Sequence, residues 1–176
     1  IPLNSADFIL TLMSVYWVEG RHELENFARA AKTPSNTSHS SPYNVFHAPS
    51  PDQLLRVAIG LGLKRGVLQN AYQILRGRDP IEKNVSEELR AARFADLKEA
   101  QAKVLNLNDW HEYITCIKSA GFRSKSMLTS ANNFLYDYLI YLIGKHEFNV
   151  AWKDLRSIMS RWFFMSALTG RYTGSP

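Results

Sequence analysis

One segment limits what this chain can fold into more than any other. Residues 134–143 read Phe-Leu-Tyr-Asp-Tyr-Leu-Ile-Tyr-Leu-Ile, so a helix formed there is apolar or aromatic nearly all round. Such a helix belongs at the centre of a bundle, where neighbouring helices cover all of its faces. A membrane span needs about 20 apolar residues. This segment is shorter and contains Asp137, so we expect a buried helix and no membrane partner.

Apolar residues recur at helical spacing along the rest of the chain, and we find no strand pattern and no internal repeat. We therefore predict an all-α fold: a single domain over residues 1–176, an irregular bundle of seven or eight helices around the buried central helix. The predicted helix starts are Ser5, Ser50 with Pro51, Ser86, Asn108, Ser126 or Ser130, and Asn149. The predicted helix ends are Gly77, Gly121 and Gly170. The apolar stripe expected on the last helix is Leu155, Ile158, Met159, Trp162, Phe163, Met165 and Leu168.

Residues 33–49 differ in composition from the rest of the chain, since proline and small polar residues dominate their first half. Such a segment lacks the apolar surface that would offset the entropy of ordering it. We expect a mobile loop here. Tyr43, Val45 and Phe46 are the residues that can attach its end to the folded body.

Charge and cysteine content narrow the class of protein. The formal net charge is +5, which permits contact with an anionic partner without requiring one. Cys116 is the only cysteine, so an internal disulfide is excluded and a reducing, cytoplasmic location fits. The chain has no starting Met and stops at Thr-Gly-Ser-Pro just after a strong helix. We therefore expect it to be a piece of a larger protein.

No catalytic or metal-binding motif is visible in the sequence. The five histidines form no His-Glu-x-x-His pair, and no Cys/His pair or Gly-x-Ser-x-Gly turn is present. The glycines of residues 60–66 fit neither spacing known for phosphate loops, so a turn between helices is the simpler interpretation. We expect no catalytic residue, no metal site and no cofactor in this piece of chain.

Basic residues gather between Asp52 and Asp79, where two helices joined by a short glycine turn are predicted. A solvated surface is the simpler interpretation of this basic cluster. The alternative is contact with the phosphates of a nucleic acid, in which lysine and arginine release counterions. The candidates for contact with a DNA backbone are Arg56, Lys64, Arg65, Arg76 and Arg78.

The end of the chain resembles a large bacterial and archaeal family. Residues 161–176 carry the resemblance, and the string Leu-Thr-Gly-Arg-Tyr-Thr-Gly-Ser at 168–175 is its most specific part. Residues 3–12, 54–58 with 72–79, and 133–144 also resemble the helical middle region of that family. Its members carry a ParB-like (sulfiredoxin-fold) nucleotide-hydrolysing domain before this region and often an HNH-type nuclease after it. The GmrSD modification-dependent restriction enzymes belong to the family that this chain resembles.

The resemblance implies partners as well as a function. The N-terminal Asp-Gly-Gln-Gln-Arg signature of the family and its histidine-centred nuclease motif are absent here, so no catalytic residue carries over. Arg161, Arg171 and Tyr172 match the family string without an assigned role, and the last two lie beyond Gly170, as an interdomain hinge would. The partners implied are the N- and C-terminal domains of the parent protein, and DNA.

Three functions follow as hypotheses. The first is a helical connector in a restriction-type DNA-targeting protein, not catalytic by itself, that touches the DNA backbone. The second is a helical module that binds another protein and has no role with nucleic acid. The third is a small helical enzyme whose active site is dispersed over the chain. A continuous basic face favours the first, and convergent buried carboxylates or histidines favour the third. The sequence carries no signal for an oligomeric state.

Overall fold

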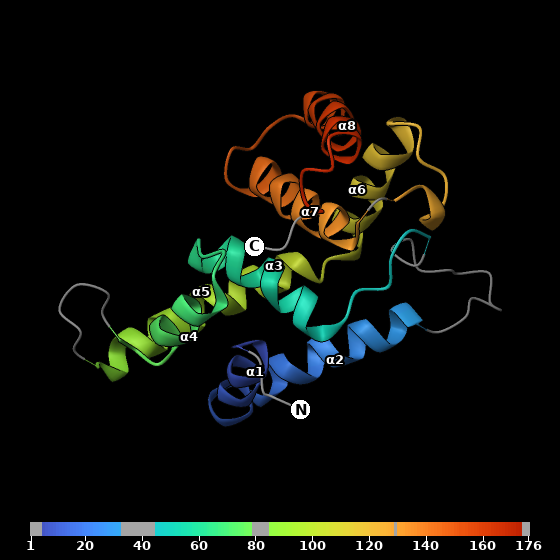
Figure 1. Ribbon diagram of the computed structural model, residues 1–176. Helices are drawn as coiled ribbons and strands as arrows, with labels where there is room; N and C mark the ends of the chain where they lie inside the picture. The colour runs from blue at the N-terminus through green and yellow to red at the C-terminus, as the bar shows by residue number, and fades with distance from the viewer. Residues whose placement is uncertain (1–4, 33–44, 79–84, 129, 174–176) are drawn as a thin grey trace. The chain divides into compact units, whose positions relative to one another are not determined.

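The computed structural model describes residues 5–32, 45–78, 85–128 and 130–173. These residues form eight α-helices and one 3-10 turn, with no strand among them, so the predicted all-α class is confirmed (Figure 1). The helices are α1 (Ser5–Tyr16), α2 (Val18–Lys32), α3 (Pro51–Leu63), α4 (Leu68–Leu75), α5 (Glu87–Val104), α6 (Leu107–Ser119), α7 (Ala131–His146) and α8 (Trp152–Leu168), with the 3-10 turn η2 (Lys125–Met127) before α7.

The described residues gather into two compact units. Unit 1 holds the residues up to Ala28 and those from Ser50 to Leu105, and unit 2 holds those from Arg29 to Pro49 and from Asn106 onward. The prediction of a single domain stays a prediction. None of the described helices combines the length and the apolar character that a membrane-spanning helix needs.

Unit 1 is built on the packing of α3 along α5, with α1 lying against α3 and α4 (Figure 1). Helix α3 begins with a capping box, in which Ser50 and Gln53 satisfy each other's free backbone N–H groups, and with Pro51 in its first turn. Apolar side chains on both helices are fully buried, and burial of each leucine or valine among them contributes about 1.5–3 kcal/mol. They include Leu54, Leu55, Ala58, Leu97 and Val104.

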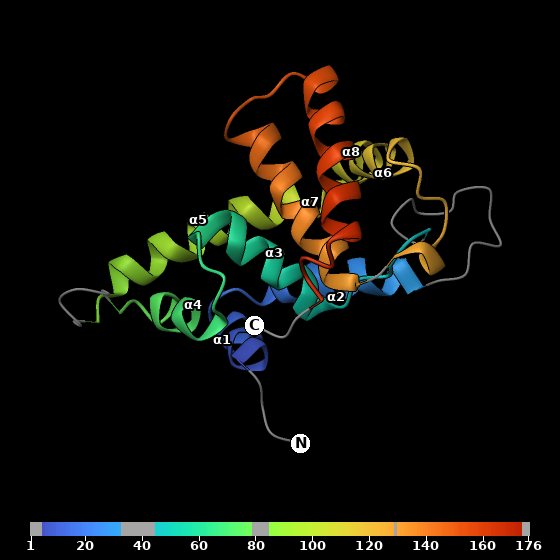
Figure 2. The same cartoon turned by 45° about the horizontal axis from the view of Figure 1, so that its top comes forward.

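Unit 2 is formed by α6, α7 and α8, with α8 packed against both of the others (Figure 2), and an aromatic core lies among them. The rings of Trp110 and Tyr138 stack with their centroids 3.8 Å apart, and Tyr113 and Phe134 pack around them. The Tyr113 hydroxyl donates to the Phe134 carbonyl oxygen at 2.6 Å, so this buried phenol has its partner. The apolar segment of α7 is thus the buried helix that the sequence predicts.

Phe46 attaches the end of the proline-rich segment as expected, whereas Val45 is exposed and does not. Phe46 is fully buried, and its ring centroid lies 6.3 Å from that of Phe134. Tyr43 and the rest of residues 33–44 lie outside the described residues, so the predicted mobile loop stays a prediction.

Some local predictions about helix ends and faces are wrong. Ile158, Met165 and Leu168 are exposed, because α8 turns Leu155, Met159 and Phe163 toward α6 and α7 instead. The first helical stretch is divided near Trp17 into α1 and α2, and α2 runs through Gly20. Asn149 adopts a left-handed conformation (φ 49°), and Ala151 is the residue that precedes α8.

Candidate functional site

All five predicted DNA-backbone candidates are exposed, and three of them meet in one pocket of unit 1. The pocket has a volume of about 300 Å³. Its cationic lining residues are Lys64, Arg65 and Arg78 together with Arg93 of α5, and its other lining residues are Gly62, Leu63, Ile74 and Leu89. We call this hollow the basic pocket.

Two glycines bring these cations together. A Cβ on Gly62 would lie 2.9 Å from the Asp96 carbonyl oxygen and from the Ala100 Cβ, so only glycine lets the end of α3 approach α5 this closely. Gly77 follows α4 with a φ of 81°, and its carbonyl accepts from the Ser86 N–H at 3.0 Å. The end of α3 is therefore held against α5 at Asp96 and Ala100, and the end of α4 is held beside the first turns of α5.

The charges of the basic pocket are only partly neutralised. Arg93 pairs with Asp96 at 3.0 Å, and Lys64 donates to the Leu61 carbonyl oxygen at 2.6 Å. Among the described residues, neither Arg65 nor Arg78 forms an ion pair with a carboxylate. Lys64 and Arg65 follow the C-terminus of α3, where the helix dipole also favours cations. The basic pocket therefore presents an excess of positive charge.

Arg56 and Arg76 do not belong to the basic pocket. Arg56 lies within α3, and the Arg76 guanidinium stands 5.7 Å from the centroid of the Tyr72 ring. Conversely, sequence reasoning missed Arg93, because this residue joins the pocket only through the packing of α3 on α5. The glycine at 62, inside an apolar helix, was the available signal of that close approach.

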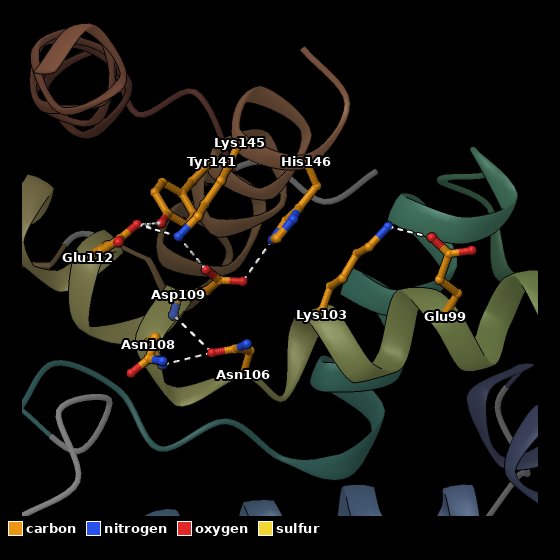
Figure 3. Close-up of polar contacts among 9 residues, drawn as sticks. All are labelled: Glu99, Lys103, Asn106, Asn108, Asp109, Glu112, Tyr141, Lys145 and His146. Carbon is orange, nitrogen blue, oxygen red and sulfur yellow. Dashed lines mark hydrogen bonds and ion pairs between the residues drawn. The ribbon is translucent and has the colours of Figure 1, made fainter. Parts of the chain in front are cut away.

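A second cluster of charged groups links α6 to α7 within unit 2 (Figure 3). Asp109 is buried, and its two oxygens lie 2.7 Å from Lys145 Nζ and 2.8 Å from His146 Nε2. The Glu112 carboxylate accepts from the Tyr141 hydroxyl and from Lys145, each at 2.5 Å. Lys145 thus bridges two carboxylates.

The local sequence explains how this network forms. Asn106 accepts hydrogen bonds from the Asn108 and Asp109 N–H groups, which caps α6 and sets Asp109 in its first turn (Figure 3). Burial disfavours the charge of Lys145, but hydrogen bonds and attraction from Asp109 and Glu112 outweigh burial and raise its pKa. Each side chain has a partner within the network, and no pocket among those described is lined by it. A brace between α6 and α7 accounts for the arrangement.

This network is one that sequence reasoning missed. The pairs His111–Glu112 and His146–Glu147 attract attention as neighbours, yet the partners that meet come from different helices. The usable signal was spacing: Asp109 and Glu112 are three residues apart and Tyr141 and Lys145 are four apart, so each pair shares a helix face.

Several residues of the C-terminal segment that carries the family resemblance pack on α7 around the buried carboxylate of Asp137. Asp137 is fully buried and accepts from Trp162 Nε1–H at 2.8 Å and from the Ser166 hydroxyl at 2.7 Å. The Arg171 guanidinium lies 5.0 Å from the Trp162 ring centroid, and the Tyr172 ring lies 5.3 Å from that of Tyr136. Arg161 is exposed on α8.

Burial dominates the electrostatics at Asp137. It raises the pKa of this carboxyl to about 6, although hydrogen bonds from Ser166 and Trp162 act in the opposite direction. Burial, with a smaller effect from the charge of Asp137, also raises the pKa of Tyr172. Within the described residues no group of three or more His, Cys, Asp or Glu side chains is arranged to hold a metal ion.

No family model, curated protein or solved structure matches the chain. The fold and the pocket geometry describe an all-α protein with a cationic pocket in unit 1. The resemblance of residues 161–176 to the ParB-like and HNH family stays an expectation.

Proposed function

We propose that this chain is a helical connector of a DNA-targeting protein and that unit 1 contacts the DNA backbone at the basic pocket. The connector role rests on the resemblance, in which a helical region stands between a nucleotide-hydrolysing domain and a nuclease. The DNA contact rests on one observation: Lys64, Arg65, Arg78 and Arg93 line one pocket, and among the described residues neither Arg65 nor Arg78 forms an ion pair.

The chemistry of the basic pocket suits contact with phosphate. Lysine and arginine neutralise phosphates and release condensed counterions, which makes such binding independent of sequence. The basic pocket has no Asn or Gln beside its arginines that would read a base edge. We expect weak binding, equal for unrelated duplexes.

The test is a titration of a fluorescently labelled duplex at low salt, followed by anisotropy. Lys64→Gln/Arg65→Gln removes two charges from the basic pocket, and we expect it to weaken binding about tenfold. Arg56→Gln/Arg76→Gln is the matched control. It removes the same charge from unit 1 outside the pocket, so it is expected to weaken binding much less.

Equal weakening by the two double variants would mean that binding follows net charge and not this pocket. Absence of binding by the wild-type chain would contradict DNA contact altogether. Thermal unfolding of each variant checks that the fold is retained.

A second candidate function is a module that binds another protein. It is favoured by the outer face of α8, where four large apolar side chains are exposed: Ile158, Phe164, Met165 and Leu168. Large apolar side chains exposed together on one helix are a feature of interaction sites. A flat DNA titration together with loss of partner-domain binding in Ile158→Ser/Leu168→Ser would favour this function over the first.

A further inference from the structure

Unit 2 contains a larger pocket, which lies between the end of α6 and the first turns of α8. Its volume is about 480 Å³, within the range usual for small-molecule sites. The lining residues are Ser119, Trp152, Lys153, Arg156, Ser157 and Ser160. We call it the α8 pocket.

One edge of the Arg156 guanidinium in the α8 pocket is fixed by a hydrogen bond to Ser119. Ser119 donates its hydroxyl proton to the Thr115 carbonyl oxygen at 2.8 Å and accepts from Arg156 Nε–H at 3.0 Å. This contact occupies the Nε edge of Arg156 and leaves the terminal amino groups available. A guanidinium presented in this way suits bidentate contact with a phosphate.

The charge of the α8 pocket is not explained by the needs of the fold. Lys153 and Arg156 belong to the first turns of α8, where the positive end of the helix dipole disfavours cations. Among the described residues neither cation forms an ion pair, and no carboxylate lines the pocket. Lys64 differs, since it follows a helix C-terminus that favours its charge.

An aromatic ring stands beside these cations. Trp152 is 41% exposed, although a side chain of this size is usually mostly buried. Trp152, Arg156 and Ser160 are four residues apart in succession, so they share one face of α8. An exposed indole next to a guanidinium offers a surface on which a nucleobase can stack while its phosphate meets the cations.

We propose that the α8 pocket binds a nucleotide, with the phosphate on Arg156 and Lys153 and the base against Trp152. This site is separate from the basic pocket and does not rest on DNA contact by unit 1. The same chemistry is offered by a free mononucleotide and by the phosphorylated end of a nucleic-acid strand.

Calorimetric titration of the whole chain tests the proposal with deoxyadenosine monophosphate as the probe. We expect a dissociation constant of about 1 mM or tighter. Deoxyadenosine and inorganic phosphate, which each supply half of the interaction, are expected to bind at least about tenfold more weakly. A tetranucleotide with and without a 5′-phosphate identifies the source: tighter binding of the phosphorylated strand than of the mononucleotide indicates a strand end, and the reverse order indicates a free nucleotide.

Two variants and a control locate the site. Arg156→Gln should weaken the mononucleotide and inorganic phosphate alike, whereas Trp152→Ala should weaken the mononucleotide and leave inorganic phosphate unchanged. Arg161→Gln removes the same charge from the same helix outside the pocket and should leave both unchanged. The proposal is overturned if the mononucleotide binds no more tightly than phosphate, or if Arg156→Gln and Arg161→Gln behave alike. It is also overturned if neither mononucleotide nor strand binds.

Discussion

At the scale of single residues, Asp137 is a carboxyl whose surroundings differ strongly from water. A carboxyl that is fully buried resists ionisation, and the donors Trp162 and Ser166 offset only part of that resistance. The unfolded chain ionises this carboxyl near its ordinary pKa of 3.8, and the folded chain ionises it at about 6. The folded state therefore holds the proton more tightly than the unfolded state.

This difference predicts a stability that depends on pH. Because the folded pKa is the higher one, the contribution of Asp137 is fully present below about pH 4 and is lost as the pH rises through about 6. The difference in free energy of unfolding between wild type and Asp137→Asn should fall by up to about 3 kcal/mol across this window. Urea unfolding at a series of pH values measures it.

Ser166→Ala refines the same test. Ser166 donates to the carboxylate and so lowers the pKa of Asp137. Without this hydroxyl, the stability contribution of Asp137 should be lost at a higher pH. A difference curve that is flat for Asp137→Asn, or one that rises with pH, would contradict the placement of this carboxyl.

At the scale of elements, the close approach of α3 to α5 determines both the core of unit 1 and the position of the basic pocket. Gly62→Ala introduces a methyl group 2.9 Å from a backbone oxygen, and backbone cannot rotate away as a side chain can. We expect a loss of about 1–3 kcal/mol in the free energy of unfolding, as for other overpacked positions. Chemical denaturation of the variant measures this loss.

Gly66→Ala is the matched control for that variant. It lies three residues beyond α3, and a Cβ there meets nothing within 4 Å. Its effect should be neutral or slightly stabilising, because alanine reduces the freedom of the unfolded chain. Equal losses for the two variants would show that helix contact is not the cause at Gly62.

Most helix ends were predictable because their causes are local, with the start of α8 at Ala151, and not Asn149, as an exception. Ser86 and Ser130 cap α5 and α7 as the sequence indicates, and Gly77, Gly121 and Gly170 follow helix ends with positive φ. The faces of α8 were not predictable in the same way. Its apolar residues cover most of its circumference, so only the position of α6 and α7 decides that Phe163 is buried and Leu168 exposed.

The candidate sites likewise contain residues whose clustering is visible in the sequence and residues that only helix packing brings together. Lys64, Arg65 and Arg78 are close in sequence, and their clustering was visible there. Arg93 joins them, and His146 meets Asp109, only through the packing of one helix on another. Spacing within a helix predicts which residues share a face, but it does not predict which face meets which.

At the scale of the whole molecule, each unit presents a cationic pocket of its own, in a chain with a net charge of +5. The basic pocket carries the proposed contact with a DNA backbone, and its four cations limit how many phosphates it can neutralise. Phosphate contacts release counterions in proportion to their number, so the salt dependence of binding counts them. A binding constant measured at one salt concentration does not give the number of phosphate contacts.

The most direct test of the central claim is therefore the slope of log affinity for duplex DNA against log salt concentration. Four contacts predict a slope of about −3 to −4 for the wild-type chain. The slope should become shallower by about 2 in Lys64→Gln/Arg65→Gln and stay unchanged in Arg56→Gln/Arg76→Gln. A wild-type slope near zero, or the same slope for all three proteins, would contradict a DNA-backbone contact at the basic pocket.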